Sequence, residues 1–400
     1  MSFTSVTGRG SVATALVLCI ASSGASVAHA TESTADRQGL AALDYGFKFA
    51  SAIETDPKGK GAAQTGIILA YLKRGAVDEA MKHAGSVEGW WRGVALAEVA
   101  VELAGEGRQA EARELVRRAE EVRQTVSGWE NTRISSHVAH ALALLGDLES
   151  SREAALKAAE ADPREYLGQS VATVAEGYAV KGEFDRAMAE LAVLEGDEEL
   201  MTTWWRTSGY IEISRKAGLS DEQRVGALMA AAASAKTVPG WRQVDALRLV
   251  AEELHVARRH AEAVAALDAA EKMIGPDGGR ATRPPTLLAE IASSWTKVGE
   301  QDRARALLVE AEQAALRLPI IDQPGLYARI ATAYLDLEDE TTTQRVLDTA
   351  IDRAEKLTNA RPRALAVVEI CRQTGIHGRE LSRQDRARLD ALLEGLGDPW

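Results

Sequence analysis

Apolar and small residues recur along this chain at helical spacing on both sides of a repeated turn. The stretches AGEGRQAEARELVRRA, AVKGEFDRAMAELAVL and TKVGEQDRARALLVEA each place a turn residue five positions before an Ala. Apolar spacings of three and four on both sides of such a turn are typical of two amphipathic helices that form a hairpin. Alignment on the turn residue gives nine turns at intervals of 32 to 41 residues: Gly75, Gly107, Gly146, Gly182, Gly218, Arg258, Gly299, Glu338 and Gly375.

Two columns of this alignment carry small side chains, which are needed where one helix approaches another closely. No segment shows the period-two alternation of a strand, so the chain is expected to be all-α. Seven positions before the turn the residues are Ile68, Ala100, Ala139, Ala175, Ile211, Ala251, Ala292, Ala331 and Val368. Five positions after the turn they are Ala80, Ala112, Ser151, Ala187, Gln223, Ala263, Ala304 and Thr343.

These columns resemble the tetratricopeptide repeat (TPR) family. Tyr178, Gly182, Phe184 and Ala187 stand at the spacing that is characteristic of that family, and the small-residue columns match in most other units. The resemblance covers roughly residues 61–377 and implies a right-handed α-solenoid of about nine antiparallel helix hairpins. The period is longer than the family's 34 residues, and the fifth unit has Gln223 in place of the small residue.

The first 30 residues have the layout of a secretory signal peptide. One cation, Arg9, precedes an apolar run that is too short to span a bilayer, and the segment ends in Ala28-His29-Ala30. Cleavage near Ala30 would place the mature protein in the periplasm or outside the cell. Cys371 would then be the remaining thiol, so the fold is expected to rest on packing without an internal disulfide.

The two ends and one internal segment fall outside the repeat. Residues 31–60 are expected to hold an N-terminal helix followed by a linker, with a break at DPKGKG. Ser382 and Asp385 have the spacing of a capping box that opens a C-terminal capping helix within residues 378–400. The segment IGPDGGRATRPP at 274–285 is expected to be a hinge between repeats 1–6 (61–273) and repeats 7–9 (286–377).

Aromatic residues follow the same period. They occur at steps of 37 to 39 residues, at or just before the start of the first helix of a unit: Trp90 and Trp91, Trp129, Tyr166, Trp204 and Trp205, and Trp241. An aromatic ring there can pack across the preceding hairpin and fix the entry angle of the helix. Adjacent residues on a helix point about 100° apart, so one member of each Trp pair could face a partner. Trp90 and Trp205 are the candidates.

The inner face of the solenoid supplies the candidate binding residues. Six positions before the turn, units four to six carry Glu176, Glu212 and Glu252, and His140 occupies this position in unit three. Arg215 and His255 lie three positions before their turns, on nearly the same face. A row of carboxylates about 10 Å apart, the helix-packing distance, suits a ligand that carries Lys or Arg. The alternative is a solvated acidic face on an acidic protein.

Charge and motifs limit the other function classes. The formal net charge of −12 disfavours nucleic acid or an anionic membrane surface as the main partner, so a neutral or basic partner is expected. The seven His residues have no metal-ligand spacing, and the chain has neither a P-loop nor a Gly-x-Ser-x-Gly elbow. No catalytic residue, metal or cofactor is therefore predicted. The sequence favours an exported scaffold for protein–protein interaction; the alternative is an exported helical-toroid enzyme that acts on a polysaccharide.

Overall fold

The computed structural model describes residues 39–54, 56–275 and 284–397, and these residues form α-helices without any strand. The all-α prediction is confirmed. The expected signal peptide and most of the expected hinge lie outside the described residues. The helices are α1 (Leu40–Ser51), α2 (Pro57–Lys73), α3 (Val77–Ala84), α4 (Trp91–Gly105), α5 (Gln109–Gln124), α6 (Trp129–Leu144), α7 (Leu148–Ala161), α8 (Pro163–Val180), α9 (Phe184–Ala192), α10 (Leu200–Arg215), α11 (Asp221–Ala235), α12 (Arg242–Val256), α13 (His260–Ile274), α14 (Pro285–Val298), α15 (Gln301–Ala315), α16 (Gln323–Asp336), α17 (Glu340–Glu355), α18 (Ala360–Ile376) and α19 (Arg383–Glu394), with one 3₁₀ turn, η2 (Ile320–Asp322).

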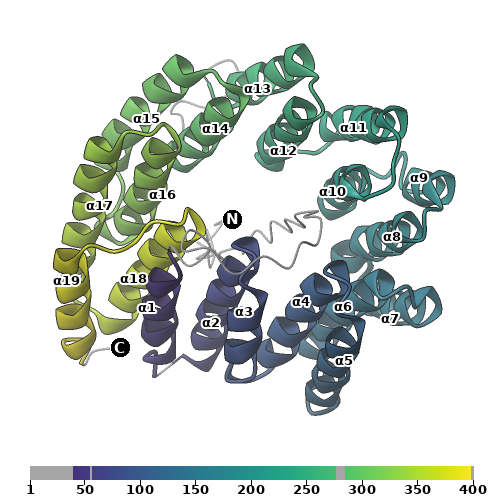
Figure 1. Ribbon diagram of the computed structural model, residues 1–400, viewed down its shortest axis with the longest axis horizontal. Coiled ribbons are helices and arrows are strands. Elements are labelled where there is room, and N and C mark those ends of the chain that lie inside the picture. The colour runs from purple at the N-terminus through teal and green to yellow at the C-terminus, as the bar shows by residue number, and fades with distance from the viewer. Residues whose placement is uncertain (1–38, 55, 276–283, 398–400) are drawn as a thin grey trace, which may run out of the picture.

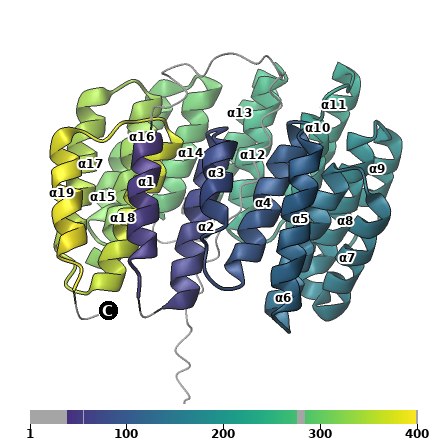
Figure 2. The same ribbon diagram turned by 60° about the horizontal axis from the view of Figure 1, so that its bottom comes forward.

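Consecutive helices form antiparallel hairpins that stack side by side around a central opening (Figure 1). From α4 to α17, the first helix of each hairpin lies on the inside and the second helix lies on the outside. In Figure 2 the helices stand upright and roughly parallel, with α2 and α4 in front of α12 and α14. The chain is therefore an α-solenoid. None of the described helices is both long and apolar enough to cross a membrane.

The turns within the hairpins lie where the sequence predicts them, with one exception. Eight predicted turn residues have a positive φ, and two of them are not glycine: Arg258 at 60° and Glu338 at 59°. At seven of these turns the backbone N–H of the residue after the turn donates to the carbonyl four residues before the turn, as from Arg108 to Leu103 at 2.8 Å, which satisfies a carbonyl that the helix end leaves unpaired. At Gly218 the carbonyl of Ser214 accepts from the Arg224 guanidinium instead. The ninth prediction is wrong. Gly375 lies within α18, and the turn residue is Gly378 with φ 69°.

The small-residue columns form the contacts between helices. The residues seven before and five after the eight correct turns are buried, except for Gln223. Gln223 takes another role, because its side chain and that of Ser220 make a capping box that opens α11. The fifth hairpin thus exchanges a packing residue for a helix cap.

Helix α1 meets α18 and closes the described solenoid into a ring. Helix α1 packs along α18 as the second helix of a hairpin packs along the first, and it also contacts α2 (Figure 1). Helix α1 is the expected N-terminal helix, and it fills the position beside α18 that the second helix of a hairpin fills in the other units. Glycines allow this close approach: a Cβ atom at Gly39 would lie 2.8 Å from the carbonyl oxygen of Gly375, and one at Gly46 would lie 2.6 Å from a methyl group of Ile67.

Polar contacts complete the closure. Tyr71 on α2 donates to Asp44 on α1 at 2.6 Å, and Arg361 on α18 contacts Asp56 at 2.5 Å. The first helix ends at Ser51, and most of DPKGKG belongs to α2 and not to a linker, because Pro57 occupies the first turn of α2, where its missing N–H costs no hydrogen bond. The predicted capping box of Ser382 opens α19, which packs outside α17.

Candidate functional site

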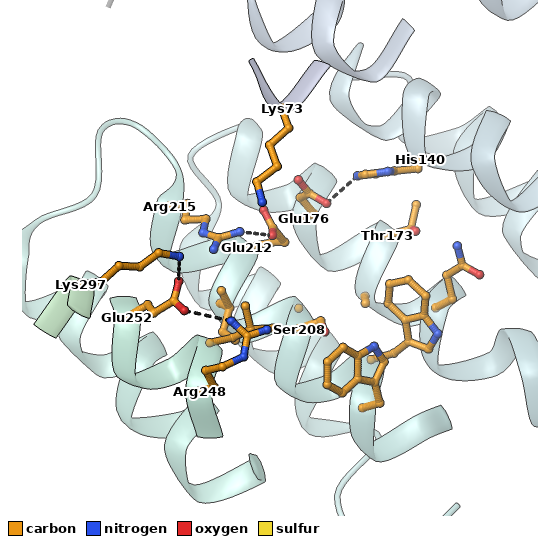
Figure 3. Close-up of a pocket in the computed structure, with 17 residues that line it drawn as sticks. Lys73, His140, Thr173, Glu176, Ser208, Glu212, Arg215, Arg248, Glu252 and Lys297 are labelled. Carbon is orange, nitrogen blue, oxygen red and sulfur yellow. Dashed lines mark hydrogen bonds and ion pairs between the residues drawn. The ribbon is translucent and has the colours of Figure 1, made fainter. Parts of the chain in front are cut away.

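The candidate site is a cavity of about 200 Å³ on the inner wall of the ring. Helices α6, α8, α10, α12 and α14 supply most of the wall, and Lys73 reaches it from the end of α2 (Figure 3). The stacking of successive hairpins brings these residues together, because each first helix presents the same face to the central opening. Residues up to 224 positions apart in the sequence, Lys73 and Lys297, thus share one cavity.

Glu176 is held by two partners from the hairpins on either side. His140 Nε2 lies 2.8 Å from one carboxylate oxygen, and Lys216 Nζ contacts the other. Glu176 is buried, which disfavours its charged form, but the charges of Lys216 and His140 outweigh burial and lower the pKa of this carboxyl. Burial likewise opposes protonation of His140, yet the Glu176 carboxylate raises the pKa of the imidazole.

Glu252 is held in the same manner on the opposite part of the wall. Arg248 donates to it at 2.9 Å, Lys297 at 2.7 Å and the Ser294 hydroxyl at 2.5 Å (Figure 3). Burial of the carboxyl is again outweighed by these cations, so its pKa falls to about 2. Glu252 is therefore ionised at any physiological pH.

Glu212 lies between these two carboxylates and shares a cation. Arg215 Nη1 donates to Glu212 at 2.6 Å, and Arg215 Nη2 donates to Glu253 on α12 at 2.6 Å. One guanidinium thus joins two adjacent hairpins through planar, charge-assisted hydrogen bonds. The predicted row of Glu176, Glu212 and Glu252 does line one wall, and each member is part of an ion pair.

The cavity is not an acidic groove. Its lining has four cationic side chains, from Lys73, Arg215, Arg248 and Lys297, against three carboxylates. The lysines could have been found in the alignment, since Lys73 and Lys297, as well as Lys216 beside Glu176, stand two positions before their turns. The prediction of the inner face used the columns six and three positions before the turn, and the lysines stand in a third column, two positions before it.

The remaining predicted residues lie in different places. Trp90 is 7 % exposed because it stacks on Trp91, with ring centroids 4.1 Å apart, and meets the edge of Trp129 at 5.0 Å. Trp91 is buried as well, so the prediction that Trp90 is exposed to a partner is wrong. Trp204 and Trp205 both line the cavity; Trp205 is half-buried, and Trp204 is buried. His255 is not part of the cavity wall, and its ring lies against His260.

Glu102 and Asp245 have carboxyl groups with a raised pKa. Burial and the neighbouring Glu98 raise the pKa of Glu102 to about 7, and burial raises that of Asp245 to about 6, with a contribution from Glu290. Neither Glu102 nor Asp245 lines the cavity. Within the described ranges, no group of three or more His, Cys, Asp or Glu side chains is placed to hold a metal ion.

Comparison with known proteins adds one remote likeness. No protein-family model matches the chain, and no curated protein matches it. One solved structure that it resembles is the crystal structure of Ton1535 from Thermococcus onnurineus NA1, at 16% sequence identity and a TM-score of 0.30, covering 80% of this chain and 93% of that chain. A likeness at this TM-score supports no conclusion about the function of the ring.

Proposed function

We propose that this chain is an exported, non-catalytic binding protein built from TPR-like repeats, and that its ligand binds in the cavity on the inner wall of the ring. The first helices of consecutive hairpins converge on that cavity with charged, polar and aromatic side chains. Concave inner faces are the usual binding surfaces of solenoids, because every repeat contributes one helix to them.

The charge state of Glu176 and Glu252 in the cavity wall is the observation that supports a binding role. Enzymes that cleave glycosidic bonds need a carboxylic acid with a raised pKa beside a second carboxylate. In the cavity, the pKa of Glu176 and that of Glu252 are lowered, so these groups hold charge and do not deliver a proton. Glu102 and Asp245, whose pKa is raised, lie elsewhere. This arrangement favours recognition over the alternative of polysaccharide cleavage.

The ion pairs also change the expected partner. A basic peptide would suit unpaired carboxylates, but it would have to displace Lys297 from Glu252 or Lys216 from Glu176. Breaking the Lys216–Glu176 pair is costly, because both side chains are largely buried. Lys297 is 51% exposed, so its pair with Glu252 costs less to open. Net charge therefore does not select the ligand, and a protein segment or a small neutral molecule fits the wall better than a basic peptide.

Site-specific photo-cross-linking tests the proposal. A photoreactive amino acid replaces Ser208, which lines the cavity, and a matched variant carries it in place of Met229, which is 46% exposed on α11, an outer helix. Both variants are exposed to extract from the cell envelope, and their circular dichroism confirms folding. We expect an adduct, either a protein or a small mass increment, that forms at position 208 and not at 229.

Two results would contradict the binding role. Equal adduct formation at both positions would mean that the cavity is not the binding surface. Release of reducing sugar ends from polysaccharides by the unmodified protein would show that it is an enzyme.

A further inference from the structure

We propose that the ring cavity is a saccharide site that holds one sugar ring against Trp205. This inference rests on the proposed function, in which the cavity binds the ligand, and it adds the chemical class of that ligand. It is carried by Trp205, by the neutral polar side chains around it and by the paired charges on the facing wall.

Trp205 is built into the wall as an aromatic platform. Its side chain is half-buried on α10 and lines the cavity, and its indole Nε1 is buried without a hydrogen-bond partner in the described part of the chain. Its position is fixed by the close approach of α8, because a Cβ atom at Gly168 would lie 2.7 Å from Thr202 Cα and 3.1 Å from Trp205 Cβ. A sugar ring has an apolar C–H face that can stack on the part of the indole that lines the cavity.

Neutral polar groups stand next to this platform. Gln169 and Thr173 on α8 and Ser208 on α10 line the same cavity. An amide offers two donors and an acceptor, and a hydroxyl offers one donor and two acceptor lone pairs. These groups match the hydroxyls of a sugar, each of which both donates and accepts.

The charged wall also suits a neutral polyol. Arg248 and Lys297 each form an ion pair with Glu252, so the carboxylate on this wall already has cationic partners. A hydroxyl can donate to a carboxylate and accept from an ammonium without separating the two. Lys297 keeps donor capacity for this, because an ammonium has three N–H groups and its side chain is 51% exposed beside Glu252. A charged ligand would have to compete with one member of the pair.

The size of the cavity limits the ligand to one ring. Pockets for drug-sized ligands are about 300–1,000 Å³, and this cavity of about 200 Å³ is smaller. A single sugar ring, free or at the end of a glycan, therefore fits better than an extended peptide segment.

The test is titration of the purified protein with a panel of pyranoses: glucose, galactose, mannose and their N-acetylated amino sugars, with sorbitol as a polyol that has no ring face. Binding is followed by tryptophan fluorescence and by calorimetry. We expect at least one pyranose to bind with a Kd in the millimolar range or tighter, and sorbitol at least tenfold more weakly.

Three variants assign the site. Trp205→Ala should weaken sugar binding at least tenfold, and Trp205→Phe, which keeps an aromatic face but loses the N–H, should weaken it less. Trp129→Ala is the matched control, because Trp129 is 52% exposed and does not line the cavity, and it should leave the Kd unchanged. Thermal unfolding of each variant separates lost binding from lost folding.

The outcomes separate this inference from the proposed function. If no pyranose binds, or if the folded Trp205→Ala and Trp205→Phe variants bind as tightly as the parent, the saccharide site is refuted. A cross-link at position 208 to a protein that no sugar displaces would refute it as well, but it would support the binding role of the cavity. If neither a cross-link at 208 nor sugar binding occurs, both proposals fall.

Discussion

His140 Nε2 lies 2.8 Å from Glu176 Oε2, and this contact joins α6 to α8 in the next hairpin. The same relationship recurs around the ring. His137 contacts Glu98 at 2.5 Å, and His377 contacts Asp336 at 2.9 Å. In each case a histidine meets a carboxylate one hairpin away, 36 to 41 residues apart in the sequence. The histidines therefore help to hold neighbouring hairpins together.

These pairs predict how stability depends on pH. Glu176 raises the pKa of His140 despite burial. The His140–Glu176 pair therefore stabilises the fold below about pH 6.5, the pKa of histidine in the unfolded chain, and this stabilisation is lost as the pH rises through the folded pKa. Despite burial, the pKa of Glu98 is lowered by His137, and that of Glu176 by Lys216 and His140. These two carboxylates therefore stabilise the fold above about pH 4.3, the pKa of glutamate in the unfolded chain, and this stabilisation is lost as the pH falls below that value. We expect the free energy of unfolding, measured with urea, to be highest between these limits and to decrease from pH 6.5 to 9.

His140→Gln is the variant that isolates the histidine. Glutamine keeps a donor for Glu176 but does not titrate, so we expect a loss of about 1 kcal/mol at pH 6 and a smaller decrease in stability between pH 6.5 and 9. An unchanged pH profile in this variant would mean that His140 is not the titrating group.

The closure of the ring predicts a second effect. Gly375 on α18 lies against Leu43 of α1, and a side chain at this position would push the two helices apart. We expect Gly375→Val to lower the free energy of unfolding by about 1–3 kcal/mol, as overpacking in a core does. Hydrogen exchange should become faster in α1, residues 40–51, before it changes in the rest of the ring.

Gly66→Ala is the control for this substitution. Gly66 lies within α2, and a Cβ atom there would meet no other atom within 4 Å. Replacing an unhindered helical glycine by alanine should stabilise the protein by about 0.5–1 kcal/mol. If hydrogen exchange in α1 stayed as slow in the Gly375→Val variant as in the parent protein, the packing of α1 would not depend on Gly375.

The repeat itself could be predicted from the sequence, but the closure could not. Alignment on the turns found Arg258 and Glu338 although neither is glycine, because the flanking Ala columns fixed their positions. The same alignment misplaced the last turn at Gly375. In that unit the glycine serves the contact with α1, and contacts between the two ends of a chain leave no periodic signal.

The candidate site was predicted only in part for a related reason. The column that contains Glu176 and Glu252 correctly gave the face of the helix, because position relative to the turn sets the direction of a side chain. The charge state of that face depends on Lys216 and Lys297, which reach back from the next hairpin. Pairing between hairpins depends on how far each helix is offset from its neighbour, which the sequence period does not specify.

The left-handed turns give a third prediction. Glu338 is exposed and has φ 59°, a conformation that costs a non-glycine residue about 1–2 kcal/mol. Glu338→Gly should therefore stabilise the protein, by about 0.5–1 kcal/mol after the extra entropy of glycine in the unfolded chain is subtracted. Gly146→Ala, at φ 78°, should destabilise it by about 1 kcal/mol. If the two variants shifted the urea midpoint in the same direction, backbone strain would not explain the glycines at these turns.

The buried Trp pair gives the last prediction. Trp90 is packed between Trp91 and Trp129, whereas Trp129 is 52% exposed and has Lys58 over its ring at 5.4 Å. Trp90→Ala should cost about 3–5 kcal/mol, because it leaves a cavity between adjacent hairpins. Trp129→Ala should cost about 1 kcal/mol, the size of an exposed aromatic and cation contact. Urea unfolding of both variants measures the difference. Equal costs would mean that the Trp90 site collapses around the smaller side chain, and that these aromatic rings do not set the spacing of the hairpins.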